Sequence, residues 1–76
     1  MVVKVYSTPT CPWCHKVKDF LKENKIKFED IDVSSNQKAG QEMVEKSGQM
    51  GVPVIDVDGK IIVGFNEGKL KESLGI

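Results

Sequence analysis

The sequence has neither a long apolar run nor an excess of charge of one sign. No stretch approaches the roughly 20 apolar residues that cross a bilayer, and the apolar start at residues 2–6 is too short for a secretion signal, so we expect a cytoplasmic protein. Eleven Lys and Arg residues balance eleven Asp and Glu residues. Without a net field toward nucleic acid or a membrane surface, neither is an expected partner. A chain of 76 residues is also expected to form a single domain, residues 1–76.

Cysteine is equally scarce, with only Cys11 and Cys14 present. Small domains stapled by disulfides usually carry four or more cysteines at wider spacings, and a bridge across so short a loop constrains the unfolded chain little. A tetrahedral zinc site needs four ligands, and the only further candidate beside the pair is His15, so one chain is not expected to bind a metal. These exclusions leave dithiol redox chemistry as the expected use of the two cysteines.

Apolar periodicity and turn residues predict seven elements in the order β-α-β-α-β-β-α. In the first predicted helix, apolar residues recur at helical spacing while lysines and acidic residues take the other face. The Asp58-Gly59 dipeptide predicts a type I′ turn between the last two strands. The predicted strands are residues 2–6, 27–33, 52–57 and 60–63, and the predicted helices are residues 12–24, residues 37–46 and a short final helix capped by Asn66.

The fold class expected from this order is α/β. Strands separated by a helix are expected to be parallel and the hairpin strands antiparallel, which gives a mixed four-stranded sheet flanked by three helices. The loop after the first strand then opens at the carboxyl end of the sheet, where ligands of such sheets bind. Both cysteines are expected at that end.

The two cysteines are expected to differ in role. Cys11 precedes Pro12, and proline is favoured at the first helical position, so Cys11 is expected at the helix N-cap, where unpaired N–H groups and the positive helix end favour its thiolate. Cys14 lies one turn further on within the apolar stripe, and its sulfur is expected beside that of Cys11 but turned inward. This arrangement predicts thiol-disulfide exchange, with Cys11 as the nucleophile and Cys14 as the resolving thiol.

Three segments of the sequence closely resemble the glutaredoxin family, and the resemblance spans essentially the whole chain. They are residues 6–14 (YSTPTCPWC), residues 51–53 (GVP) and residues 64–65 (GF). The resemblance implies a thioredoxin-like fold in which the Val52–Pro53 peptide bond is cis beside the redox motif. It also implies that the backbone of Val52 pairs with a bound peptide or glutathione. The residues alone favour a trans bond, because most bonds before proline are trans.

The resemblance further implies an enzyme, a monomeric disulfide reductase with no bound cofactor that acts on disulfide-containing proteins. The expected substrate-binding residues are Pro12, Trp13, Val52, Pro53, Gly64, Phe65 and Asn66. Val52, Gly64 and Asn66 are expected to offer backbone donors to a carboxylate. The position of Trp13, one residue off the apolar stripe, leaves open whether it contacts substrates or packs inside, and Phe65 is expected to cover the core or the hairpin.

Two departures from the family pattern leave the source of electrons open. Members that use glutathione commonly carry Lys at the place of Thr8, and Gly-Gly followed by a polar or acidic pair where this sequence has residues 64–67 (GFNE). The Gly-Phe pair is more similar to short redoxins that take electrons from thioredoxin reductase. The Pro12-Trp13 spacer, however, is close to the glutaredoxin pattern. Glutathione and a thioredoxin reductase are therefore both expected donors.

The alternative function is an iron–sulfur cluster or metal carrier in which two chains share the metal through Cys11. Pro12 and Cys14 weaken it, because cluster-carrying members of the family usually have a different spacer and lack the second cysteine. Near the pair, His15 is expected to be a solvated residue that mildly supports the thiolate. A solvated helix face is expected for Lys16, Lys18 and Lys22.

Overall fold

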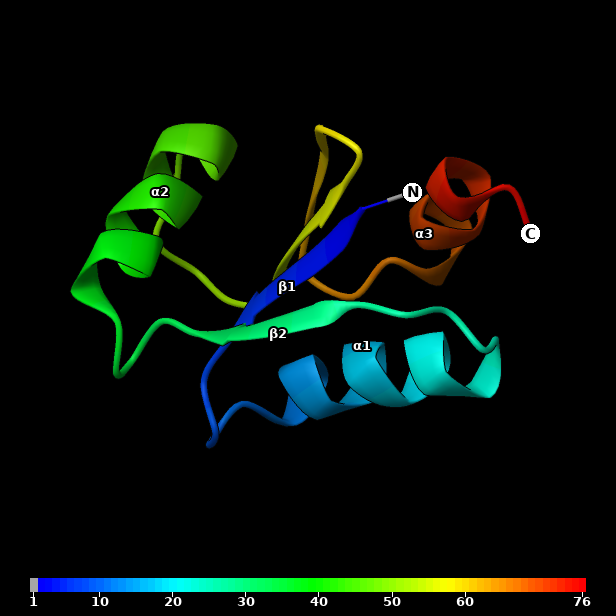
Figure 1. Ribbon diagram of the computed structural model, residues 1–76, viewed down its shortest axis with the longest axis horizontal. Helices are drawn as coiled ribbons and strands as arrows, with labels where there is room; N and C mark the ends of the chain where they lie inside the picture. Colours follow the sequence, from blue (N-terminus) through cyan, green and yellow to red (C-terminus); the bar gives the residue numbers. More distant parts are fainter. Residues whose placement is uncertain (1) are drawn as a thin grey trace.

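The computed structural model describes residues 2–76 and shows the seven expected elements in the expected order (Figure 1). The strands are β1 (Val3–Ser7), β2 (Glu29–Asp32), β3 (Val54–Val57) and β4 (Lys60–Val63). The helices are α1 (Pro12–Glu23), α2 (Gln37–Ser47) and α3 (Glu67–Leu74). Within residues 2–76, none of the helices has the length and apolar character needed to cross a membrane. The α/β class predicted from the sequence is confirmed.

The four strands form one mixed sheet in the order β2-β1-β3-β4. β1 pairs in parallel with β2, whereas β3 is antiparallel to both β1 and β4. The expectation that strands separated by a helix run parallel is therefore confirmed for β2 and wrong for β3. Val54 at the start of β3 lies opposite Tyr6 near the end of β1, so α2 does not return the chain to the other end of the sheet. The strand begins after Pro53, which has no N–H to donate to the ladder.

The turn between β3 and β4 has the geometry predicted from its two residues. Asp58 has a φ of 50° and Gly59 a φ of 91°, the two positive values of a type I′ turn. The Gly59 N–H also donates to Asp56 Oδ1 at 2.7 Å, which ties the turn to the preceding strand. This hairpin fixes the register in which Ile55 lies opposite Ile62.

Apolar side chains cover both faces of the sheet, because alternate residues of a strand point to opposite sides. On one face, α1 and α3 cover a cluster that includes Val3, Val5, Val17, Leu21, Ile55 and Leu70. On the other face, α2 covers a smaller cluster of Tyr6, Ala39, Met43 and Val54. The first cluster packs α1, and with it the cysteine pair, against β1 and β3, the two central strands of the sheet.

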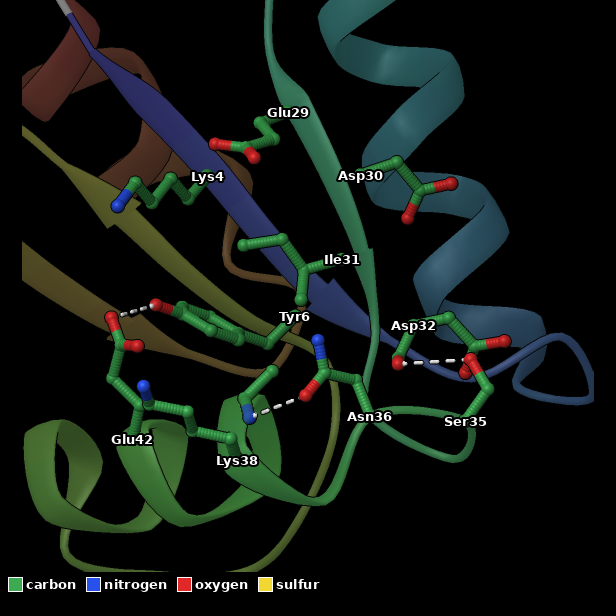
Figure 2. A pocket seen from close by; sticks show the side chains of 11 residues that line it. Lys4, Tyr6, Glu29, Asp30, Ile31, Asp32, Ser35, Asn36, Lys38 and Glu42 are labelled. Atoms are coloured by element: carbon green, nitrogen blue, oxygen red, sulfur yellow. Dashed lines mark hydrogen bonds between the residues drawn. The ribbon is translucent and has the colours of Figure 1, made fainter.

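A charged network joins α2 to the second face of the sheet. Lys46 Nζ lies 2.8 Å from Asp56 Oδ2 and 3.1 Å from Glu42 Oε1. Lys46 also donates to the Tyr6 hydroxyl. That hydroxyl in turn donates to Glu42 at 3.0 Å (Figure 2). Burial alone opposes ionisation of Asp56, but the Lys46 ammonium and the Gly59 N–H outweigh it and hold the pKa of Asp56 below its ordinary value. Conversely, the hydrogen bond with Asp56 is the largest of the effects that raise the pKa of Lys46.

This network predicts an acid-sensitive contribution to stability. Because the folded-state pKa of Asp56 is lowered, its contact with Lys46 stabilises the fold above about pH 4 and is lost as the pH falls through the folded-state pKa. We predict that Asp56→Asn lowers the free energy of unfolding by about 1–2 kcal/mol at neutral pH and by less in acid. Urea denaturation of the wild type and of Asp56→Asn, each at neutral pH and in acid, measures the loss of stability. Lys71→Gln, which removes an exposed pair with Glu67, is the control and should change little; equal losses at both pH values for Asp56→Asn would contradict the prediction.

Candidate active site

Cys11 occupies the N-cap of α1, as the proline after it predicts. Its backbone is extended, with φ −92° and ψ 112°, Pro12 starts the helix, and its Sγ accepts the backbone N–H of Cys14 at 3.2 Å. The first turn of α1 contains no acidic residue, so no carboxylate of that turn offsets the positive helix end beside the sulfur. Cys11 is partly exposed, and its Sγ lies 4.0 Å from the carbonyl oxygen of Val52. An accessible sulfur that accepts a helix N–H is suited to act as a thiolate nucleophile.

Cys14, one helical turn further on, lies in a different environment. Its side chain is fully buried, and both cysteines are free thiols. Burial, followed by the hydrogen bond of Cys11 and more weakly by its charge, raises the pKa of Cys14 to about 11, while the Thr8 backbone and Lys18 act in the opposite direction. Cys14 is therefore protonated at neutral pH, while the sulfur of Cys11 stays accessible.

The segment before β3 lies beside the cysteine pair. The Val52–Pro53 peptide bond is cis, as the family resemblance implies. A small open pocket of about 260 Å³ is lined by Trp13, Val52, Pro53, Gly64 and Phe65. The fold thus brings together five of the predicted substrate-binding residues. The other two, Pro12 and Asn66, are exposed and do not line this pocket.

Trp13 forms an exposed wall of this pocket. Its side chain is 54% exposed, which decides the alternative left open by the sequence in favour of a surface position. Its ring centroid lies 6.5 Å from that of Phe65, and the Phe65 ring meets that of Phe20 edge to face at 6.1 Å. Phe65 therefore covers the core, as expected, and also lines the pocket. Lys16 Nζ lies 4.4 Å from the Trp13 ring centroid, so this lysine makes a cation–π contact as well as facing solvent.

The Gly64 backbone and the Asn66 side chain already have partners within the protein. Gly64 has a φ of 76°, and its N–H donates to the Pro53 carbonyl at 2.8 Å. The expectation that Gly64 offers a free donor to a carboxylate is therefore wrong. Asn66 caps α3 as expected, since its Oδ1 accepts the Lys69 N–H at 3.1 Å. Glu67 follows in the first turn, so a carboxylate already lies at the helix end that would attract an anion.

Lys18 departs from the expectation of a solvated lysine. Its side chain is only 14% exposed, and its Nζ lies 3.1 Å from Asp30 Oδ2 on β2. Ser7, at the end of β1, donates to the other Asp30 oxygen at 2.8 Å. In the sequence, only the position of Lys18 one turn after Cys14 indicates that it lies near the redox pair. Its partner on β2 depends on the pairing of β1 with β2, which no local pattern in the sequence shows.

The loop before α1 is tied to the start of that helix. The Thr8 carbonyl accepts the Cys11 N–H at 3.3 Å, and His15 Nε2 donates to the Pro9 carbonyl at 3.0 Å. His15 is exposed, as expected, but this contact gives it a structural part that the sequence does not reveal. Lys22 is exposed, as expected.

A second, more polar pocket lies on the face of the sheet covered by α2 (Figure 2). Tyr6, Ile31 and Glu42 are among the residues that line it, and neither cysteine does. Over residues 2–76, no group of three or more His, Cys, Asp or Glu side chains is arranged to hold a metal ion. The chemistry-bearing residues therefore gather at the start of α1.

A mixed sheet in this strand order, a Cys-x-x-Cys pair at the start of the first helix and a cis proline beside the exposed sulfur define a thiol oxidoreductase. Comparison with known families agrees, because the family model described as glutaredoxin matches residues 3–62. The chain belongs to the glutaredoxin family, whose members are thiol-disulfide oxidoreductases.

Individual proteins are similar over most of their length. The chain is 52% identical over 69 residues to a Clostridium pasteurianum protein described as an uncharacterized glutaredoxin-like 8.6 kDa protein in the rubredoxin operon, covering 91% of this chain and 92% of that protein. It is 32% identical over 65 residues to glutaredoxin 3 of Escherichia coli K12, covering 86% and 78%. A crystal structure of a mutant of the thioredoxin-like protein BC3987 matches with a TM-score of 0.92 at 34% identity, covering 97% of this chain and 95% of the other. The thioredoxin-like fold is confirmed.

The contrast between the two sulfurs predicts selective alkylation. We predict that iodoacetamide modifies Cys11 and spares Cys14 in the native, reduced protein at neutral pH. With a pKa of about 11, Cys14 has a thiolate fraction on the order of 100-fold below that of an ordinary cysteine, and burial further blocks access to it. Brief alkylation, denaturation with a second label and mass spectrometry of the peptides measure both sites. Equal labelling of the two cysteines would contradict the prediction.

Proposed function

We propose that this chain reduces disulfide bonds in proteins and mixed disulfides, with Cys11 as the nucleophile and Cys14 as the resolving thiol. The observation that carries the proposal is the difference between the sulfurs: Cys11 is accessible at a helix N-cap, whereas Cys14 is buried and protonated. A nucleophile and a resolving thiol need this difference, and an inert pair does not. The two sulfurs carry the electrons, so a monomer without a bound cofactor suffices.

In the first step, the Cys11 thiolate attacks one sulfur of the substrate disulfide. A bond forms between Cys11 Sγ and that sulfur, the substrate S–S bond breaks, and the other substrate sulfur leaves as a thiolate that takes up a proton. The Val52 carbonyl lies 4.0 Å from the attacking sulfur, so an extended substrate segment can pair with the backbone there as an added strand. The pocket beside Trp13 and Phe65 can take an apolar side chain next to the substrate cysteine.

In the second step, Cys14 attacks Cys11 Sγ, the Cys11–Cys14 disulfide forms and the second substrate thiolate leaves. The substrate disulfide is thereby reduced and the protein dithiol oxidised by the same electron pair. Cys14 must first lose its proton. Two of the causes that raise its pKa, the hydrogen bond and the charge of Cys11, disappear when Cys11 enters the mixed disulfide. The pKa of Cys14 should therefore fall only after substrate capture, which orders the two steps.

Two serine variants test this division of roles. Cys11→Ser should abolish disulfide reduction, because the remaining thiol is buried and protonated. Cys14→Ser should still attack a peptide disulfide but accumulate the mixed disulfide, since nothing displaces the bound peptide thiol. Thiol release and the mass of the intact protein measure both outcomes. Full activity of Cys11→Ser would end the proposal.

We further infer that a thioredoxin reductase, rather than glutathione, supplies the electrons. Glutathione is anionic, and its carboxylates need N–H donors or cations. The Gly64 N–H is taken by Pro53, and Thr8 replaces the Lys common in glutathione-using members. The residues that line the pocket beside Cys11 carry no charge. These contacts support an apolar protein surface as the partner of this site.

A donor assay tests the inference. Reduction of a model disulfide should proceed with thioredoxin reductase and NADPH, and at least about tenfold more slowly with glutathione, glutathione reductase and NADPH, which corresponds to one missing charged contact. Thr8→Lys supplies the cation that glutathione-using members commonly carry at this place and should raise the glutathione-dependent rate while leaving the other rate unchanged. A faster rate with glutathione in the wild type would overturn the inference about the donor without affecting the dithiol mechanism.

A further inference from the structure

An ion pair lies one helical turn behind the buried thiol. Lys18 follows Cys14 in the i,i+4 relation on α1, so the two side chains share one side of the helix. Lys18 Nζ lies 3.1 Å from Asp30 Oδ2, and the lysine side chain is largely covered. Asp30 points from β2 toward α1, whereas its neighbours Glu29 and Ile31 point the other way (Figure 2). A lysine is thus held against the body of the protein, where lysines are rare.

A second contact fixes Asp30. Ser7, only 2% exposed, donates to Asp30 Oδ1 at 2.8 Å while Lys18 takes Oδ2. Since both carboxylate oxygens have partners, Asp30 cannot turn without losing one of them. Ser7 is the last residue of β1 and directly precedes Thr8, whose backbone also acts on Cys14. The same strand end therefore positions the redox loop and the ion pair.

Two charged side chains act on the pKa of Cys14 in opposite directions. The charge of Cys11 raises this pKa, whereas that of Lys18 lowers it more weakly and the Thr8 backbone lowers it through a hydrogen bond. Asp30 on β2 is paired with Lys18. The other elements present uncharged side chains to this face of the sheet, namely Val5, Ser7, Ile55 and Leu70. When Cys11 enters the mixed disulfide its charge is lost, whereas the charge of Lys18, which favours a thiolate at Cys14, remains.

We propose that Lys18, held by Asp30, is a positioning residue for the release step, whose ammonium stabilises the Cys14 thiolate as it attacks the disulfide between Cys11 and the substrate. The proposal rests on the proposed function, because it requires Cys14 to be the resolving thiol. Cys14 gives its proton to solvent, its sulfur bonds to Cys11 Sγ, and the substrate thiolate leaves with the electron pair of the broken bond. Lys18 keeps its proton throughout and contributes its charge alone.

The expected effect is moderate. Lys18 and Asp30 lie at the wall of an open pocket between α1 and β2, which His15 and Lys22 also line. Water in this pocket screens the lysine charge, so its removal should change the release rate roughly fivefold rather than by orders of magnitude. The same exposure makes the effect sensitive to salt.

The aromatic disulfide dithiobis(nitrobenzoate) separates the two steps in one reaction. Attack by Cys11 releases one coloured thiol, and attack by Cys14 releases a second from the mixed disulfide, so stopped-flow absorbance over a pH series gives a rate for each. Lys18→Met keeps the apolar stem and removes the charge. It should slow the second release roughly fivefold at neutral pH and move its pH midpoint upward, while the first release stays within about twofold. Lys18→Arg should restore the second release.

The matched control is Lys22→Met, which removes an exposed lysine one turn further along α1 at the same pocket and should change neither release. Added salt should slow the second release of the wild type toward that of Lys18→Met. A circular dichroism spectrum like that of the wild type shows that a variant is folded. An unchanged second release in Lys18→Met, or a slow one that Lys18→Arg does not restore, would overturn the proposal. Failure of the wild type to release the second thiol would instead overturn the role of Cys14.

Discussion

The active site depends on one hydrogen bond, from the backbone N–H of Cys14 to the Sγ of Cys11. The first N–H groups of a helix lack partners within it, and here a sulfur at the N-cap serves as one of those partners. The residue that donates this N–H is also the one that carries the second thiol, so the bond fixes both sulfurs relative to each other. Pro12 fits because the first helical position needs no N–H partner. One helical turn therefore orients two sulfurs and leaves only that of Cys11 accessible.

The rest of the fold presents this helix end to a substrate. The end of β1 lies beside the start of β3, with Tyr6 opposite Val54. The loop before α1 and the segment before β3 therefore lie at the same end of the sheet. The direction of β3 is essential for this. If β3 ran parallel to β1, it would begin at the opposite end of the sheet, and the Val52 carbonyl would lie a strand length away from Cys11. The antiparallel β3, which the sequence did not predict, is what completes the site.

Local patterns predicted the features that local physics decides. The cap positions of Cys11 and Asn66 depend on residues within one turn, so the sequence alone places them. The direction of β3 depends on the end of the sheet at which the chain emerges from α2. The hydrogen bond of the Gly64 N–H depends on the Pro53 carbonyl, which lies on another segment. Neither can be read from neighbours in the sequence. The contact between α1 and β2 that covers Lys18 has the same origin, because helix periodicity shows which side a lysine takes but not which acidic residue lies across from it.

Strand alternation assigns the charges of β2 to different tasks. Glu29 and Asp30 are consecutive, so their side chains point to opposite faces (Figure 2). A shift of one residue in register would therefore turn the carboxylate of Asp30 away from Lys18. On the α2 face, Lys46 is surrounded by acidic partners and holds a helix in place. On the α1 face, a single carboxylate positions Lys18 one turn from a thiol that must ionise in an apolar setting. A chain with no net charge can therefore still direct a positive charge at one sulfur, because placement rather than the total decides the local field.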